Sequence, residues 1–177
     1  MILYVSGNLS QSPAQVLVNT VNTVGVMGKG IALEFKRLYP DMFKEYQRRC
    51  EGGDLDIGKL FLYKTPHKWI LNFPTKRHWR EASRVEYIER GLEEFRRVYS
   101  QSGIHSIAFP PLGCGNGRLD FKTQVQPIMH RRLSVLPIDV FIYPVQRDDL
   151  IAEHEQPNQM QQWLRSEPEF AVLGSLG

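Results

Sequence analysis

The sequence of 177 residues has little cysteine, with only Cys50 and Cys114. Cys50 follows a charged segment and Cys114 lies among glycines, so the pair forms neither a disulfide framework nor a four-ligand zinc site. The sequence also lacks an apolar run of membrane-spanning length, and its first residues lack the basic and apolar regions of a signal peptide. We therefore expect a cytoplasmic protein without membrane association.

A strong excess of one charge is also missing, since 22 Lys and Arg residues face 19 Asp and Glu residues, a net charge of +3. This small excess is compatible with a polyanionic partner and equally with ordinary surface charge. Hydrophobic residues make up 42% of the chain and charged residues 23%, which is typical of a soluble globular protein. The length fits one domain with a short appendage, and we expect a monomer.

Short apolar runs alternate with helical patterns along the chain. The runs predict strands at 2–6, 15–20, 59–64, 69–73, 106–109 and 140–143, and the helical patterns predict helices at 29–38, 83–99 and 121–133. A further helix is expected at 40–49, because proline is favoured in a first turn and two glycines follow at 52–53. Pro127 should kink the last helix or lie where its first turn ends. We expect a three-layer α/β/α domain over 1–145, with a mixed, mainly parallel sheet and helices on both faces. Residues 146–177 should form a C-terminal extension, with a polar helix at 148–165 and a tail.

Two segments join an expected strand to an expected helix through glycine-rich loops. The first, 19–30, contains Asn19, Asn22 and three glycines; the second, 109–117, contains three alternating glycines around Cys114. Glycine lets a backbone approach a phosphate closely, and two such loops at strand ends could clasp a diphosphate. Each loop alone could equally be a tight turn that needs positive φ. The spacing matches neither the Rossmann nor the Walker A pattern.

The third segment, 72–80, follows another expected strand and is basic. Lys76, Arg77 and Arg80 crowd together there, with His78 and Trp79 between them. One interpretation is a solvated surface loop. The other is functional, because crowded cations lower the pKa of a lysine, whose neutral amine can act as nucleophile or base. For Cys114, which has no obvious base beside it, a packing role is favoured over a nucleophilic one.

These three segments together resemble the macrodomain family over about 1–145. Within that family the likeness is to the lysine-dependent ADP-ribosyl glycohydrolases, and most to the DarG type that acts on ADP-ribosylated DNA. Residues 18–32 look like the first substrate loop of this branch, 72–79 like its catalytic-lysine loop and 110–120 like its diphosphate loop.

The resemblance implies a macrodomain fold and a role for each segment. Lys76 would be the catalytic residue, Asn22 would hold the distal ribose, and His78 would shuttle a proton or contact a nucleobase. The DNA would contact Arg77, Trp79 and Arg80. ADP-ribose would contact Asn8, Leu9, Asn19, Thr20, Asn22, Gly25, Val26, Met27, Gly28, Lys29, Gly30, Pro111, Leu112, Gly113, Cys114, Gly115, Asn116 and Gly117.

The resemblance also implies partners. The substrate would be ADP-ribosylated single-stranded DNA, and a DarT-like ADP-ribosyltransferase toxin would be the enzyme whose modification is reversed. The lysine-dependent scheme needs no metal or other cofactor, and the sequence shows no clustered carboxylate–histidine site.

Two positions depart from the family pattern. Many macrodomains carry an aspartate after the first strand that bonds the adenine amino group, whereas this chain has Asn8. Its amide oxygen can still accept that bond, but without the charge. The protein-directed relatives also place a catalytic aspartate in the second glycine loop, where this chain reads Gly-Asn-Gly-Arg at 115–118, with Asp120 the nearest carboxylate. This departure favours DNA as the substrate.

Three other functions stay open at this stage. The chain could be a reader that binds ADP-ribose without turnover, in which case Lys76 and His78 would have no chemical role. It could release ADP-ribose from protein or act on O-acetyl-ADP-ribose. It could also be a nucleotide-binding partner protein whose basic loop only contacts nucleic acid, with binding that falls steeply with salt.

Overall fold

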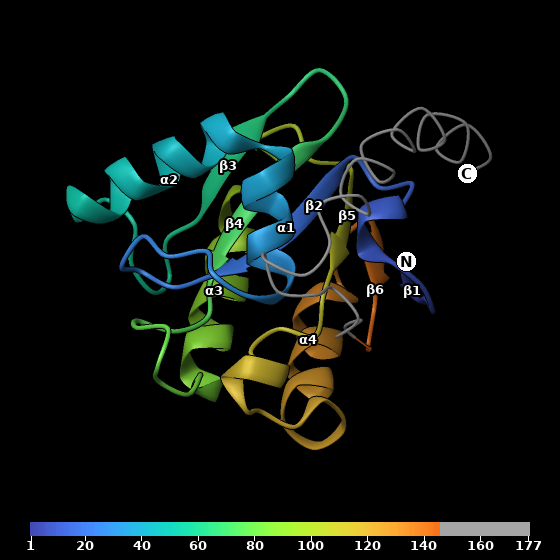
Figure 1. Ribbon diagram of the computed structural model, residues 1–177. Coiled ribbons are helices and arrows are strands. Elements are labelled where there is room, and N and C mark those ends of the chain that lie inside the picture. The colour runs from blue at the N-terminus through green and yellow to red at the C-terminus, as the bar shows by residue number, and fades with distance from the viewer. Residues whose placement is uncertain (146–177) are drawn as a thin grey trace.

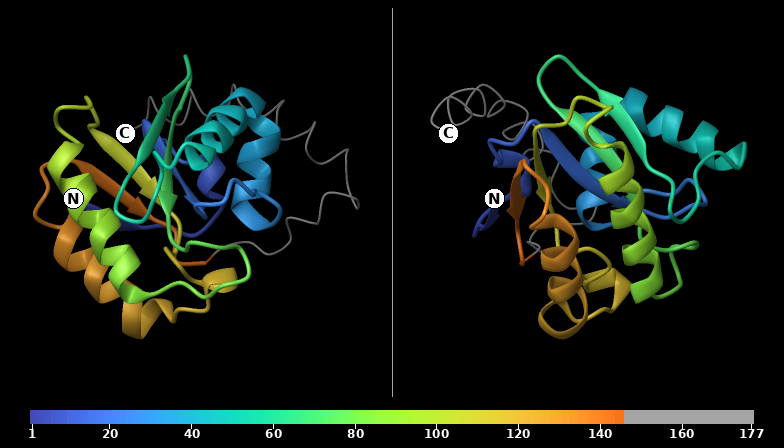
Figure 2. Two further views of the ribbon diagram at one scale, coloured as in Figure 1. Left: turned by 90° about the vertical axis from the view of Figure 1, so that its left-hand side faces the viewer. Right: turned by 180° about the vertical axis from the view of Figure 1, so that it is seen from behind.

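The computed structural model describes residues 1–145. The extension expected at 146–177, with its helix at 148–165, lies outside the described residues. Within residues 1–145, helices cover both faces of one central sheet, as Figure 1 and the two views of Figure 2 show. This confirms the expected three-layer arrangement. None of the helices in this part of the chain is both long and apolar enough to cross a membrane.

The sheet has six strands in the order β1-β6-β5-β2-β4-β3. Every neighbouring pair is parallel except β3 and β4, which are antiparallel and joined by a short turn. The expected mixed, mainly parallel sheet is therefore confirmed. The strands are β1 (Ile2–Tyr4), β2 (Val16–Val21), β3 (Phe61–Lys64), β4 (Trp69–Pro74), β5 (Ser106–Phe109) and β6 (Asp139–Ile142).

Alternating side chains of the central strands build one core on each face of the sheet. Leu17 and Ile70 pack with α1 (Gly30–Leu38) and α2 (Pro40–Glu51). Val18 and Leu71, one residue further along, pack with α3 (Val85–Val98) and α4 (Gln126–Leu133) on the other face. Both faces of β2 and β4 are thus covered, which explains why these strands read as continuous apolar runs in the sequence.

The helices begin and end where local chemistry requires. Pro40 lies in the first turn of α2, Arg48 and Arg49 lie in its last turn near the negative end of the helix dipole, and Gly53 follows with a φ of +73°. Helix α3 approaches β4 very closely, because Gly91 presents no side chain to the Phe73 ring.

The segment expected as one helix at 121–133 is divided in the structure. One π-helical stretch runs from Phe121 to Val125, and α4 begins at Gln126 with Pro127 in its first turn. Proline has no N–H to donate, so it is tolerated at a helix start but not inside a continuous helix. The Asp120 carboxylate caps the π-helical stretch by accepting from the Thr123 N–H at 2.8 Å.

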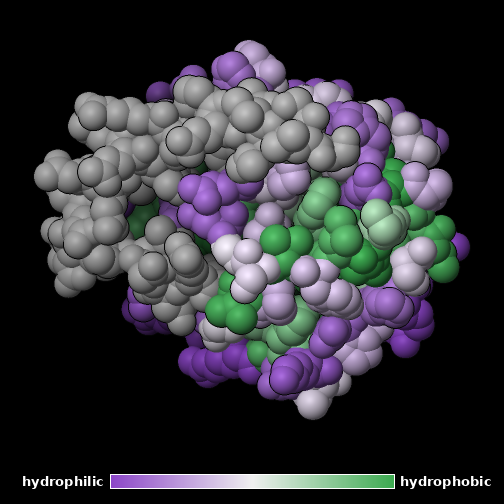
Figure 3. All heavy atoms as spheres, turned by 90° about the vertical axis from the view of Figure 1, so that its right-hand side faces the viewer, coloured by the Kyte–Doolittle hydropathy of each residue, from purple (hydrophilic) through white to green (hydrophobic). Residues whose placement is uncertain are grey.

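The β1 edge of the sheet exposes apolar side chains. At the β1 edge, Leu3 and Tyr4 are more than a third exposed. Figure 3 views the molecule from the right-hand side of Figure 1, where β1 lies, and shows exposed hydrophobic side chains among hydrophilic ones.

Strands β2, β4 and β5 are parallel neighbours in the middle of the sheet, so their carboxyl ends lie at the same edge. The chain leaves β2 into the first glycine-rich segment, β4 into the basic segment, and β5 into the second glycine-rich segment. A short 3-10 helix at Gly115–Gly117 lies in the last of these, and another at Leu9–Gln11 follows β1. The three segments singled out in the sequence therefore meet in space.

Candidate active site

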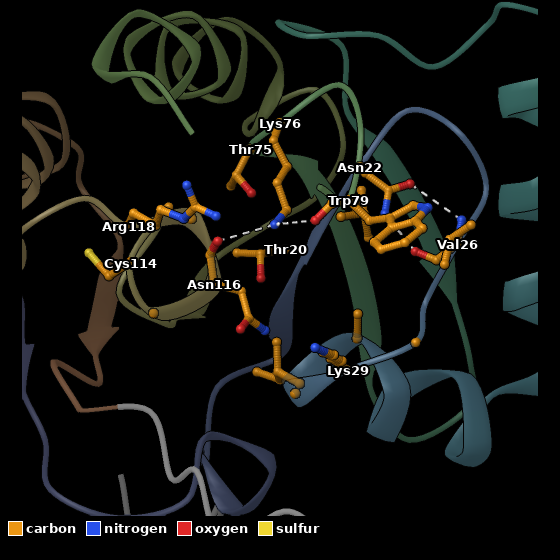
Figure 4. A pocket seen from close by; sticks show the side chains of 18 of the residues that line it. Thr20, Asn22, Val26, Lys29, Thr75, Lys76, Trp79, Cys114, Asn116 and Arg118 are labelled. Carbon is orange, nitrogen blue, oxygen red and sulfur yellow. Dashed lines mark hydrogen bonds between the residues drawn. The ribbon is translucent and has the colours of Figure 1, made fainter. Parts of the chain in front are cut away.

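A cleft of about 640 Å³ opens where these three segments meet (Figure 4). This volume is in the range of small-molecule binding sites. The first segment lines it with Thr20, Val21, Asn22, Val26, Gly28, Lys29, Gly30, Ile31 and Ala32, the basic segment with Thr75, Lys76, Trp79 and Arg80, and the second glycine segment with Gly113, Cys114, Gly115, Asn116, Gly117 and Arg118.

Lys76 extends into the cleft between the two glycine-rich segments, as Figure 4 shows. Its Nζ donates to the carbonyl oxygens of Trp79 at 3.2 Å and Asn116 at 3.3 Å. Partial burial lowers the pKa of the Lys76 amine, and the nearby charges of Arg118 and Lys29 lower it further. More of this amine is therefore neutral at a given pH than in an ordinary lysine, as a nucleophile requires.

Asn22 is buried at the end of β2, where its side chain also shapes the loop that follows. The side-chain oxygen accepts from the N–H groups of Val24 at 3.1 Å and Val26 at 3.3 Å, and the amide nitrogen donates to the Val26 carbonyl at 2.7 Å. The Tyr46 hydroxyl, from α2, donates to the same side-chain oxygen. Asn22 therefore fixes the first loop from within and lines the cleft at the same time.

The amino end of α1 faces the cleft through Gly30, Ile31 and Ala32. The Leu33 N–H donates to the Lys29 carbonyl at 3.3 Å, which is the first hydrogen bond of the helix. The N–H groups of residues 30–32 therefore have no partner within the helix. Unpaired amides and the positive end of a helix dipole together favour an anion.

The second glycine loop is held tightly against the start of α3. The Ser83 N–H donates to the Gly117 carbonyl at 2.9 Å, and a Cβ on Gly117 would lie 2.5 Å from the Ser83 Oγ. Gly113 has a φ of +72°, and a Cβ there would lie 2.8 Å from Leu119. A side chain at Gly113 or Gly117 would displace this loop, which explains why glycine occupies these two positions.

The aromatic and cationic side chains of the basic segment form a stacked platform at the edge of the cleft. The Trp79 side chain is 45% exposed, the Arg80 guanidinium lies 4.6 Å from the centre of its ring, and the His78 ring stacks on it at 5.3 Å. The Arg77 carbonyl accepts from the N–H and hydroxyl of Thr23, both at 3.0 Å, which ties this segment to the first loop.

The structure brings together most of the residues expected at the site, but not all of them. His78 and Arg77 are next to the cleft without lining it; the His78 Nδ1 accepts from the Arg80 N–H at 3.1 Å. Seven residues expected to contact ADP-ribose are also outside the lining, and their roles stay predictions: Asn8, Leu9, Asn19, Gly25, Met27, Pro111 and Leu112.

Several of these positions have clear structural partners. Asn19 is buried, and its side-chain amide donates to the Asn72 side chain at 3.1 Å. Neighbouring residues of a strand point to opposite faces, so Thr20 lines the cleft and Asn19 does not. The Asn8 side-chain oxygen accepts from the Ser10 N–H at 3.1 Å and so caps the 3-10 helix after β1. Leu112 is fully buried in the core.

Sequence reasoning missed Thr75, Arg118 and Tyr46. Thr75 and Arg118 line the cleft, and the Tyr46 hydroxyl donates to the main-chain and side-chain oxygens of Asn22. Thr75 is adjacent to the predicted lysine, which was a usable signal, but nothing in the local sequence links Tyr46 to a loop more than twenty residues earlier. Among residues 1–145, no group of three or more His, Cys, Asp or Glu side chains could hold a metal ion.

Comparison with known proteins gives consistent matches. A model of the Macro domain family matches residues 18–128, which is more than half of the chain. The DNA ADP-ribosyl glycohydrolase of Mycobacterium tuberculosis is 48% identical over 148 residues, which cover 81% of this chain and 42% of that protein. The chain thus spans less than half the length of this curated relative.

Two solved structures are similar in sequence and in fold. The macrodomain of Mycobacterium tuberculosis DarG matches with a TM-score of 0.79 and 48% identity, covering 82% of this chain and 99% of that one. Thermosipho africanus DarTG in complex with ADP-ribose matches with a TM-score of 0.77 and 41% identity, covering 81% of this chain and 42% of that one. From its three loops, its sheet and these matches, the chain belongs to the Macro domain family.

Proposed function

We propose that this chain is a hydrolase that removes ADP-ribose from ADP-ribosylated DNA bases, with Lys76 as its catalytic residue. The observation that carries the proposal is the position of the Lys76 amine, which lies inside the cleft between the two glycine-rich segments. A protein that only binds ADP-ribose has no need of a lysine with a lowered pKa at this place.

The cleft offers complementary groups for each part of ADP-ribose. The unpaired amides at the start of α1 and the glycine loop at 113–117 suit the diphosphate, which is an extended anion. Asn22 and Lys76 would then face the distal ribose. The relative from Thermosipho africanus, whose structure is a complex with ADP-ribose, supports this choice of ligand.

In the proposed reaction the neutral Lys76 amine attacks the anomeric carbon of the distal ribose. The glycosidic C–N bond breaks, and the base leaves with its electron pair and takes up a proton. The sugar ring then opens as the amine becomes a Schiff base. Water adds to the Schiff-base carbon, the C–N bond to Lys76 breaks, and ADP-ribose departs. His78, whose ring stacks on Trp79 at the edge of the cleft, would assist with protons through its Nε2, because its Nδ1 accepts from the Arg80 N–H.

DNA is the favoured carrier of the modification. The exposed Trp79 ring with Arg80 against it suits an unpaired base and its phosphate, since stacking and charge together hold single-stranded nucleic acid. The similarity to a DNA ADP-ribosyl glycohydrolase supports the same choice. A transferase that attaches ADP-ribose to DNA bases must then supply the substrate. We propose that this transferase is a DarT-like toxin, whose modification the present chain reverses.

The test compares the unmodified chain with Lys76→Ala and with Lys44→Ala, which alters a lysine whose side chain is 77% exposed on α2. We expect the chain and Lys44→Ala to release ADP-ribose from a modified single-stranded oligonucleotide. Lys76→Ala should bind ADP-ribose but release none. Sodium cyanoborohydride should trap the Schiff base as a covalent adduct on Lys76, which mass spectrometry would locate.

Parallel substrates decide between the alternatives. ADP-ribosylated protein and O-acetyl-ADP-ribose should be turned over more slowly than the oligonucleotide. Release by Lys76→Ala at the normal rate would exclude the lysine mechanism. Binding of ADP-ribose without release from any substrate would identify a reader instead.

A further inference from the structure

Arg118 adopts a backbone conformation that arginine normally avoids. Its φ is +66°, and no other non-glycine residue in 1–145 has a positive φ. Two main-chain bonds hold it there, from the Arg118 N–H to the Gly115 carbonyl at 2.9 Å and from the Leu119 N–H to the Gly113 carbonyl at 3.0 Å. Glycine or asparagine would adopt this conformation more easily, so an arginine at this strained position indicates a function for its side chain.

The side chain of Arg118 lies in the cleft and faces Lys76 (Figure 4). It forms no hydrogen bond or ion pair with the residues that the structure describes, and its charge is one cause of the lowered pKa of Lys76. A guanidinium carries five donors in a planar fork and matches the oxygens of a phosphate in pairs. In this position it is available for an anion that comes with the ligand.

The location of Arg118 indicates which anion this is. Figure 4 shows Arg118 and Trp79 on opposite sides of the Lys76 amine, while Lys29 and the start of α1 lie across the cleft. If Lys76 attacks the distal ribose, the modified base leaves beside this amine, and the strand that carries the base must pass there. Each nucleotide of the strand brings one phosphodiester, whereas the Trp79 ring can stack on a base.

We propose that Arg118 is a binding site for the nucleic acid backbone, in which its guanidinium pairs with a phosphodiester next to the modified nucleotide. This inference rests on the proposed function and adds a residue that selects DNA over carriers without phosphate. Arg118 and Trp79 then hold the strand on both sides of the reactive amine, one through a phosphate and the other through a base.

The test measures binding in the Lys76→Ala background, where no turnover intervenes. Arg118→Asn removes the charge and keeps a residue that tolerates the left-handed conformation; Arg118→Lys keeps the charge. Arg96→Gln is the matched control, because it removes one charge from an exposed residue in the last turn of α3. Thermal unfolding of each variant checks that it is folded. The ligands are ADP-ribose and an ADP-ribosylated single-stranded oligonucleotide, each titrated over a range of salt concentrations.

We expect Arg118→Asn to weaken binding of the oligonucleotide about tenfold, with Arg118→Lys in between and Arg96→Gln unchanged. Affinity for ADP-ribose should stay within about twofold. The slope of log affinity against log salt should become shallower by about 0.7 for the oligonucleotide, which is the value for one phosphate contact on a single strand.

Two outcomes would overturn this inference. An equal loss of affinity for ADP-ribose and for the oligonucleotide would place Arg118 on the diphosphate. Unchanged affinity for both would show that it contacts no anion of the substrate. Failure of the proposed function is distinguishable from either, since in that case the chain with Lys76 intact would release no ADP-ribose from the oligonucleotide, whatever residue stands at 118.

Discussion

The hydroxyl of Tyr46 lies 2.8 Å from the main-chain oxygen of Asn22 and 2.9 Å from its side-chain oxygen. Tyr46 is fully buried on α2, and burial raises the pKa of its hydroxyl far above the usual value, so the group stays a donor at all ordinary pH values. One proton is shared between two acceptors of the same residue. The loop that lines the cleft is thereby anchored to a helix that does not line it.

Replacing Tyr46 with phenylalanine should therefore affect both stability and binding. The change leaves buried oxygens of Asn22 without this donor, so the free energy of unfolding should fall by about 1–2 kcal/mol. Affinity for ADP-ribose should fall too, because the loop at 22–30 loses its anchor. Urea denaturation and calorimetric titration measure the two effects. Tyr99→Phe is the control, since the Tyr99 hydroxyl has no hydrogen-bond partner in the described part of the chain. Equal effects of both changes would refute the anchoring role.

The rate of the proposed reaction should increase with pH and then level off. Only the neutral Lys76 amine attacks, so the rate grows as pH passes upward through the pKa of this amine. Burial, Arg118 and Lys29 lower that pKa, so the plateau should begin below the value of about 10.4 of an ordinary lysine. Single-turnover rates at saturating substrate measure the profile.

The pH profile of Arg118→Asn tests whether neighbouring positive charge lowers the pKa of Lys76. Removal of a neighbouring cation raises the pKa of Lys76, so the rising limb should move to higher pH. A profile that falls over this range, or one that Arg118→Asn shifts downward, contradicts the role assigned to the neutral amine.

Cys114 should be a poor nucleophile although it lines the cleft. Burial, with a contribution from Asp120, raises the pKa of its thiol to about 11. Since the thiolate is the reactive form, iodoacetamide at pH 7.5 should alkylate Cys114 more than tenfold more slowly than it alkylates glutathione. Mass spectrometry of timed samples gives the rate. Alkylation as fast as that of glutathione would reopen the nucleophilic interpretation of this residue.

Gly91→Ala should destabilise the domain, because a methyl group at this position would overlap the ring of Phe73. Helix α3 would have to move away from β4, and overpacking of this kind costs about 1–3 kcal/mol of unfolding free energy. Urea denaturation measures the loss. Adding Phe73→Leu should restore part of it, since the shorter side chain removes the atoms in conflict. A double variant less stable than Gly91→Ala alone would show that the contact is not the cause.

The elements of the fold followed from the sequence because each depends on local chemistry. Short apolar runs predicted all six strands, an amphipathic pattern predicted α1, and three- and four-residue spacing predicted α3. Helix α2 was predicted from Pro40 at its start and the glycines that follow its end. The division of the segment at 121–133 was predicted in part: Pro127 indicated an interruption, but the π-helical stretch before it, which packs against α3, was not predicted. Packing between segments that are distant in the sequence cannot be read from a local window.

The sequence by itself determined which segments line the cleft: two glycine loops and a lysine loop, each at the end of a strand. Those segments were recognisable because the backbone freedom of glycine and the crowding of cations around Lys76 can both be read from a few consecutive residues. Only the tertiary structure decided how they are used. The order of β5, β2 and β4 brings the Lys76 amine to the Asn116 carbonyl forty residues away, and the same packing puts Thr20 in the cleft and Asn19 beneath it. The burial of Lys76 and the closeness of its amine to the charges of Arg118 and Lys29 arise from contacts between distant segments, so they exist only once the chain is folded.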